Sequence, residues 1–145
     1  MSAALTLIAR ICLSAIFLGA GVNKILDIES TVLAMQNAGI PYPNMLVWGA
    51  IVFLILGGLS VAAGCFTRLG TLMLMIFLGM ATYYFHPFWK ADDLTKMDQM
   101  IAFQKNLGLF GGLLFLFANG PGPASFDGRR IVREEVVVEK TVVAD

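Results

Sequence analysis

The 145-residue chain is 58% hydrophobic and only 14% charged, and its mean hydropathy is +0.79. A soluble domain is about 45–50% apolar and about 25% charged, so these residues cannot build a water-facing surface of the usual kind. The formal net charge is zero, and no basic stretch is interleaved with aromatic residues, which argues against a nucleic-acid partner. The composition therefore indicates a single integral membrane domain whose main partner is the lipid bilayer.

The first apolar segment covers about residues 5–25 and carries one charge, Arg10. Its length suits a membrane span, which needs about 20 residues. A signal peptide is the alternative, but the position three before a cut after Ala20 is Leu18 instead of a small residue. Because three more apolar segments follow, we interpret this segment as a retained span.

The next segment, residues 23–44, mixes polar side chains with apolar ones that recur at helical spacing. This pattern predicts a short amphipathic helix at the membrane interface. Residues 39–43 contain two prolines and should end it, because proline lacks the N–H donor that a helix needs.

Three further spans are expected, at about residues 45–64, 69–85 and 97–118. The link between the first two of these is so short that they should form an antiparallel hairpin. Thr95 and Asp98 resemble a capping box at the start of the last span. The glycines and prolines of residues 119–123 should end that span.

The expected fold class is therefore all-α, an integral membrane four-helix bundle with short loops formed by residues 1–124. A polar, charged tail follows at residues 125–145 and is too polar to cross a membrane. Arginine and lysine in short loops favour the cytoplasmic side, and four spans place Arg10, Arg68 and Arg129 at the same end. We therefore expect a multi-pass protein with both termini, and the tail, in the cytoplasm.

Lys105 lies five residues, or about 7.5 Å, past Met100 in the apolar part of the last span. A charge at that depth is costly unless it is paired or reaches the interface. Either Lys105 extends to the interface, or it lines a polar pocket inside the bundle. The candidate pocket collects polar side chains of similar depth on the outer side: Lys24, Tyr83, His86, Lys105 and Asn106.

His86 stands in a run of aromatic residues typical of a membrane interface. The alternative role is to exchange hydrogen bonds or protons with a quinone head group. The two cysteines, Cys12 and Cys65, have no metal-ligand spacing, so no metal site is expected, and we expect both thiols to pack between helices. No phosphate loop or nucleophile elbow is present, so no catalytic residue is assigned.

The order and spacing of several short motifs resemble the DoxX family of small four-helix membrane proteins, from about Ile8 to Asp127. The residues that carry the resemblance are Arg10, Gly21-Val22-Asn23-Lys24, Gly39-Ile40-Pro41, Gly57-Gly58, Gly64, Thr67-Arg68, His86, Phe88-Trp89, Phe103-Gln104-Lys105-Asn106-Leu107, Gly111-Gly112-Leu113-Leu114, Gly120-Pro121-Gly122 and Ser125-Phe126-Asp127.

The resemblance implies a bacterial-type inner-membrane protein. Some relatives serve as membrane subunits of quinone-linked oxidation of sulfur compounds, and others associate with redox-protective complexes. Relatives often carry a glutamate shortly before the glycine pair, where this chain has Leu54 and other apolar residues.

We therefore expect a subunit accessory to a redox or respiratory, quinone-linked system, either non-catalytic or forming the quinone-binding part of an oxidoreductase. Quinone is the candidate cofactor, and the candidate partners are a redox or respiratory membrane complex and a second copy of the chain. A structural or assembly protein without chemistry of its own is the alternative, followed by a small transporter.

Overall fold

The computed structural model describes residues 2–129 and contains, within that range, helices and no strands. Four helices are long and apolar enough to cross a membrane: α1 (Ala3–Leu26), α3 (Pro43–Ala63), α4 (Thr67–Phe85) and α5 (Lys96–Asn119). Each overlaps one of the four expected spans and differs from it by at most a few residues at either end. The expected fold class, an all-α membrane bundle, is therefore confirmed.

The α3–α4 hairpin forms because specific residues start α3, end it, and turn the chain into α4. Pro43 occupies the first turn of α3, where its missing N–H has no partner to lose. The helix ends at Gly64, whose φ of 69° lies in the left-handed region that glycine tolerates. Phe66 also has a positive φ, 50°, and this second turn reverses the chain into α4.

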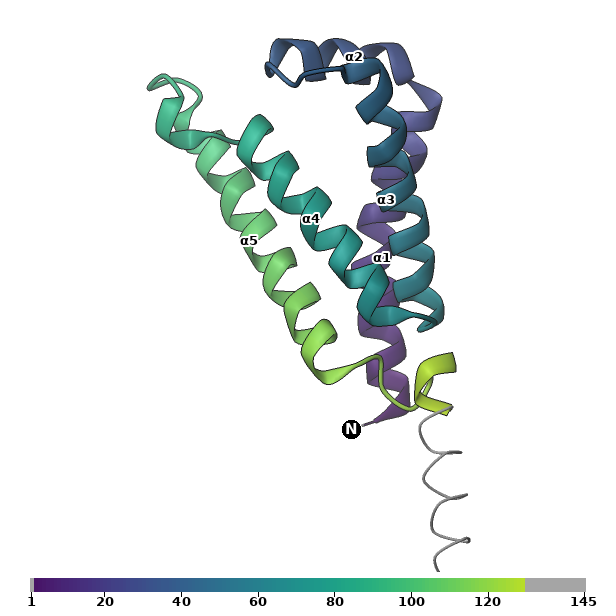
Figure 1. Cartoon of the computed structure of the whole chain (residues 1–145). Coiled ribbons are helices and arrows are strands. Elements are labelled where there is room, and N and C mark those ends of the chain that lie inside the picture. The colour runs from purple at the N-terminus through teal and green to yellow at the C-terminus, as the bar shows by residue number, and fades with distance from the viewer. Residues whose placement is uncertain (1, 130–145) are drawn as a thin grey trace, which may run out of the picture.

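The short helix α2 (Ile28–Asn37) lies across the ends of the long helices (Figure 1). It begins where the Asp27 carboxylate accepts a hydrogen bond from Ser30 N at 3.1 Å, and it ends before Gly39, which has a φ of 73°. Its buried residue Met35 packs in a small apolar cluster with Val47 and Ile51 of α3. The predicted short amphipathic helix is confirmed.

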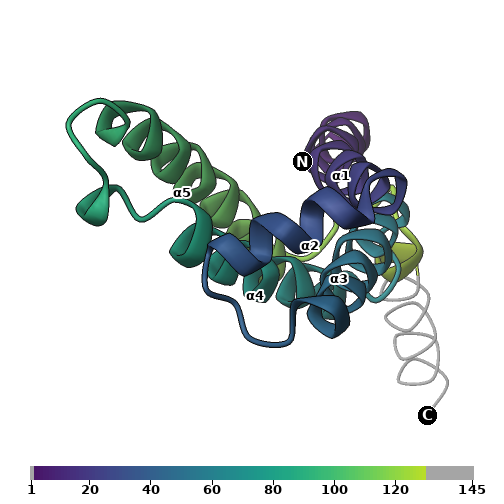
Figure 2. The ribbon, with the colours of Figure 1, turned by 90° about the horizontal axis from the view of Figure 1, so that it is seen from above.

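The long helices pack chiefly with their neighbours in the chain: α1 with α3, α3 with α4, and α4 with α5. We call the end that carries Ala3 and Asn119 the terminal end, and the opposite end the α2 end. The α4–α5 pair lies close to α1 and α3 at the terminal end and diverges from them toward the α2 end (Figure 1). Seen from above, α2 crosses from α1 toward α4 (Figure 2).

The main apolar core joins all four long helices through Phe17, Leu54, Leu74 and Leu113. Leu54 is 0% exposed. Close packing of α3 against α4 depends on Gly57, since a Cβ added there would lie 2.8 Å from Leu74 Cγ. This is the small-residue packing expected of membrane helices.

The loop between α4 and α5 contains a turn of 3₁₀-helix, η1 (Phe88–Lys90). Thr95 is the N-cap residue of α5, but its side chain makes no capping hydrogen bond. Instead, Asp92 accepts hydrogen bonds from Thr95 N at 2.9 Å and from its hydroxyl. The capping box expected with Asp98 was therefore wrong, because Asp92 offers Thr95 a nearer partner in the loop.

Beyond α5, residues 126–129 form one helical turn that lies at the terminal end (Figure 1). The rest of the expected tail, residues 130–145, lies outside the described residues.

Candidate functional site

A groove of about 700 Å³ lies at the α2 end between α2, α3 and α4. We call it the α2 groove. Its walls are mostly apolar and include Met35 of α2, Phe53 of α3 and Phe77 of α4. The volume falls within the range of about 300–1,000 Å³ that is usual for sites binding small molecules or cofactors.

Two of the predicted site residues, Lys24 and His86, line the α2 groove. Lys24 lies in the last turn of α1, where a cation also interacts favourably with the helix C-terminus. It is half-buried, and no hydrogen-bonding or charged partner within residues 2–129 acts on its ammonium. The groove therefore combines an apolar body with an unpaired cationic donor.

His86 is the residue that ends α4, and it is half-buried. Its Nδ1 lies 3.1 Å from Oε1 of Gln99, a residue of α5. The contact joins two helices across the intervening loop and fixes the ring. Tyr84, which sequence reasoning left out of the candidate pocket, also lines the groove.

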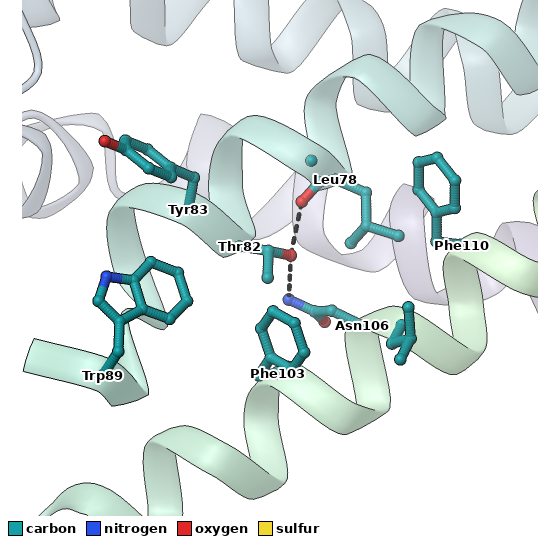
Figure 3. Close-up of a pocket in the computed structure, with 9 residues that line it drawn as sticks. Leu78, Thr82, Tyr83, Trp89, Phe103, Asn106 and Phe110 are labelled. Atoms are coloured by element: carbon teal, nitrogen blue, oxygen red, sulfur yellow. Dashed lines mark hydrogen bonds between the residues drawn. The ribbon is translucent and has the colours of Figure 1, made fainter. Parts of the chain in front are cut away.

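Two other predicted residues, Tyr83 and Asn106, line a smaller pocket of about 250 Å³ between α4 and α5. Asn106 Nδ2 donates a hydrogen bond to Thr82 Oγ1 at 2.9 Å, and Thr82 Oγ1 donates to Leu78 O at 2.6 Å (Figure 3). Tyr83 and Trp89 lie side by side along this pocket, with ring centroids 6.3 Å apart (Figure 3). The Asn106 side chain thus joins α4 to α5.

Lys105, the fifth residue of the candidate pocket, lines neither cavity. Its side chain is exposed on α5. The structure therefore divides the five residues into a pair in the α2 groove, a pair in the smaller pocket, and one exposed lysine.

A second polar cluster, which sequence reasoning did not single out as a site, lies at the terminal end. Arg10 of α1 is 1% exposed, and its Nη2 donates a hydrogen bond to Ala124 O. Its Nε and Nη1 have no partner within residues 2–129. Gly64 lies against this guanidinium, where any Cβ would collide with Arg10 Nη1.

Asp127 completes this terminal cluster by capping α4. Its carboxylate accepts hydrogen bonds from Phe66 N at 3.0 Å, from Thr67 N at 2.8 Å and from Thr67 Oγ1 at 2.8 Å, while its own N–H donates to Gly64 O at 2.9 Å. Burial raises the pKa of Asp127, but the hydrogen bonds from Thr67 and Phe66 and the charge of Arg10 together lower it below the ordinary value.

The terminal cluster brings together residues that are far apart in the sequence. They contributed to the family resemblance, but the sequence assigned them to no site: Arg10, Gly64, Thr67, Gly122, Ser125 and Asp127. Their hydrogen bonds are structural, since they tie the segment after α5 to α1, α3 and α4. Reading Arg10 only as a topology signal missed this, because its partner is a backbone carbonyl 114 residues away.

Within residues 2–129, no group of three or more His, Cys, Asp or Glu side chains could hold a metal ion. Cys12 and Cys65 are both free thiols. Cys65 is half-buried in the turn between α3 and α4, and Cys12 is exposed on α1. The expectation that both thiols pack between helices was therefore wrong for Cys12, whose side chain no other helix within residues 2–129 covers.

The sequence is similar to a known family and to individual relatives. A family model described as DoxX matches residues 5–87. The inner membrane protein YphA of Escherichia coli is 34% identical over 126 residues, which is 86% of this chain and 89% of YphA. The inner membrane protein YqjF of the same organism is 31% identical over 121 residues, which is 83% of this chain and 88% of YqjF. No solved structure matches the chain.

Proposed function

Because the chain belongs to the DoxX family of inner membrane proteins, we propose that it is a membrane subunit accessory to a quinone-linked redox system and that it binds a quinone in the α2 groove. The observation that carries the proposal is the composition of the groove. A mostly apolar cavity of about 700 Å³ is lined by a cationic side chain, Lys24, and by His86. This combination suits an amphiphile with a small polar head and an apolar tail.

Lys24 and His86 would each bind one oxygen of such a head. A lysine ammonium only donates hydrogen bonds, so Lys24 would bind one carbonyl or phenolate oxygen. A histidine ring nitrogen can exchange a hydrogen bond with a polar head, so His86 would bind the other oxygen. The tail would lie along the apolar walls formed by α2, α3 and α4, where burial of each CH₂ contributes about 0.8 kcal/mol.

Within this proposal both termini are cytoplasmic, which puts the α2 groove at the outer half of the membrane. Arg10, Arg68 and Arg129 belong to the terminal end, whereas Lys90 and Lys96 at the α2 end are accompanied by acidic residues. Paired reporter fusions test this orientation. After Asp145, a reporter that works only in the cytoplasm should be active, and one that works only outside it should be inactive. A reporter inserted after the exposed Leu94 should show the opposite preference.

The binding test is extraction of quinone from protein purified in its native lipids, with variants matched between the two cavities. Gly49 lines the α2 groove and Gly79 lines the smaller pocket, and a Cβ added at either meets nothing within 4 Å. Gly49→Leu should therefore fill the groove and remove the quinone, while Gly79→Leu should keep it. A wild-type protein that carries only phospholipid, or a Gly49→Leu variant that retains quinone, would contradict the proposal.

A second set of variants tests the proposed polar contacts with the quinone head. Lys24→Met and His86→Leu should each lower quinone occupancy about 5- to 10-fold, since one hydrogen bond contributes about 1 kcal/mol. Lys105→Met makes the same chemical change at an exposed lysine that lines neither cavity, so it should have no effect. Equal losses in Lys24→Met and Lys105→Met would point to a general effect of surface charge.

A further inference from the structure

The side-chain amide of Gln99 is the hydrogen-bond partner of one ring nitrogen of His86. The atom that faces His86 Nδ1 at 3.1 Å is Gln99 Oε1, and an amide oxygen can only accept. With the amide in this orientation, Nδ1 donates. In a neutral imidazole one nitrogen is a donor and the other an acceptor, so Nε2 keeps its lone pair.

We infer that Gln99 is a positioning residue which holds His86 as the Nδ1–H tautomer, so that the α2 groove selects the reduced, hydroxyl-bearing form of its ligand. The inference rests on the proposed function and specifies its substrate class. A quinol head has O–H groups that can donate a hydrogen bond to Nε2. An oxidised quinone has only acceptor oxygens, so it can form no hydrogen bond with the Nε2 lone pair. Lys24, a pure donor, takes the second oxygen of either form.

The arrangement also gives His86 a proton-accepting role. In that step the O–H bond of the quinol breaks, a new N–H bond forms at Nε2, and the electron pair stays on the oxygen. The resulting phenolate lies in the groove that Lys24 lines, where the ammonium stabilises its charge. The step moves a proton and no electrons, so it needs no oxidant.

The identity of residue 99 suits this role. Gln99 fixes the ring through a neutral amide, whereas a carboxylate in the same place would add a negative charge that favours the doubly protonated imidazolium. A doubly protonated ring has no lone pair left for an O–H donor. The neutral partner therefore keeps Nε2 able to accept a proton.

The chain has a single histidine, so ¹⁵N labelling of histidine reports on His86 alone. In protein reconstituted into lipid nanodiscs without ligand, we expect Nδ1 to be coupled to a proton and Nε2 to have the chemical shift of an unprotonated nitrogen. Gln99→Leu should abolish this preference, and Gln99→Glu, which keeps an acceptor oxygen, should retain a proton on Nδ1.

Gln104→Leu is the matched control, because Gln104 is an exposed glutamine of the same helix and should leave the spectrum unchanged. A wild-type spectrum with the proton on Nε2 would overturn the inference, as would a Gln99→Leu spectrum identical to that of the wild type.

The ligand selection is measured separately, by titrating the nanodiscs with decylubiquinol under argon and with decylubiquinone in air. The wild type should bind the quinol about 3- to 10-fold more tightly, the effect of one hydrogen bond, and Gln99→Leu should lose this preference while Gln104→Leu keeps it. Equal or tighter binding of the quinone to the wild type would refute the inference alone. Binding of neither form would instead refute the proposed function.

Discussion

The carboxylate of Asp127 offers a sharp test of the terminal cluster, because it makes three hydrogen bonds to the start of α4. Replacing a residue that caps a helix N-terminus costs about 0.5–2 kcal/mol. Here the loss also leaves Thr67, which is 0% exposed, with a buried N–H and hydroxyl that lack partners, a penalty of about 1–3 kcal/mol. We therefore expect Asp127→Ala to lower the free energy of unfolding by about 2–3 kcal/mol.

The assay is reversible unfolding in mixed micelles followed by circular dichroism. Asp93→Ala is the control, because Asp93 is an exposed loop carboxylate and its removal should change stability by less than about 0.5 kcal/mol. Asp127→Asn should fall between the two, since its amide oxygen can still accept one of the N–H donors. Equal stability of the Asp127→Ala and Asp93→Ala variants would refute the reasoning.

The same carboxylate sets a pH dependence. Because the pKa of Asp127 is lower in the folded protein than its ordinary value of 3.8, its stabilisation is fully present above that value and is lost as the pH falls through the folded-state pKa. The difference in stability between wild type and Asp127→Ala should therefore be constant between about pH 5 and 8 and should shrink below about pH 4. A difference that instead grows on acidification would contradict the assignment of the cap to an ionised carboxylate.

Three further predictions address other parts of the fold. Gly64→Ala should prevent stable folding, because a Cβ there would collide with Arg10 and Ser125 and because the φ of 69° is unfavourable for alanine. The control is Gly19→Ala, where a Cβ meets nothing within 4 Å. This variant should be neutral or slightly stabilising in the same unfolding assay. Leu54→Glu should lower stability by about 3 kcal/mol or more, because Leu54 is 0% exposed in the apolar core; a stable variant would show that the core can solvate a carboxylate. Asn106→Leu removes the hydrogen bond to Thr82 and should cost about 0.6–2 kcal/mol, measured against Asn119→Leu, which changes the same residue type at the exposed end of α5.

The positions of the helices could be predicted because their signals are local. Long apolar segments, Pro43 at the start of α3 and Gly64 at its end are visible without any knowledge of the fold. The capping residue of α5 could not be predicted with the same success, since Thr95 and Asp98 match a common pattern while the actual partner, Asp92, lies on the other side of Thr95. Local patterns fail where two acceptors compete for one donor.

For the candidate site, the sequence predicted only the depth of each residue in the membrane. Counting residues along each helix placed Lys24, His86 and Lys105 at similar heights, but it carried no information on the rotation of a helix about its axis. That rotation brings Lys24 and His86 to one groove and turns Lys105 outward. The role of Gln99 depends on a contact across the α4–α5 loop, which no periodicity reveals.

The packing of each long helix against its neighbour in the chain has a consequence for how the protein assembles. Contacts between sequence neighbours need little loop closure, so each helix can find its partner as soon as both are in the membrane. The bonds of the segment after α5 are exceptions, since Arg10 to Ala124 spans 114 residues and Phe66 to Asp127 spans 61. The hydrogen bond from the buried guanidinium of Arg10 can therefore form only after the segment beyond α5 has been synthesised and has reached the first helix.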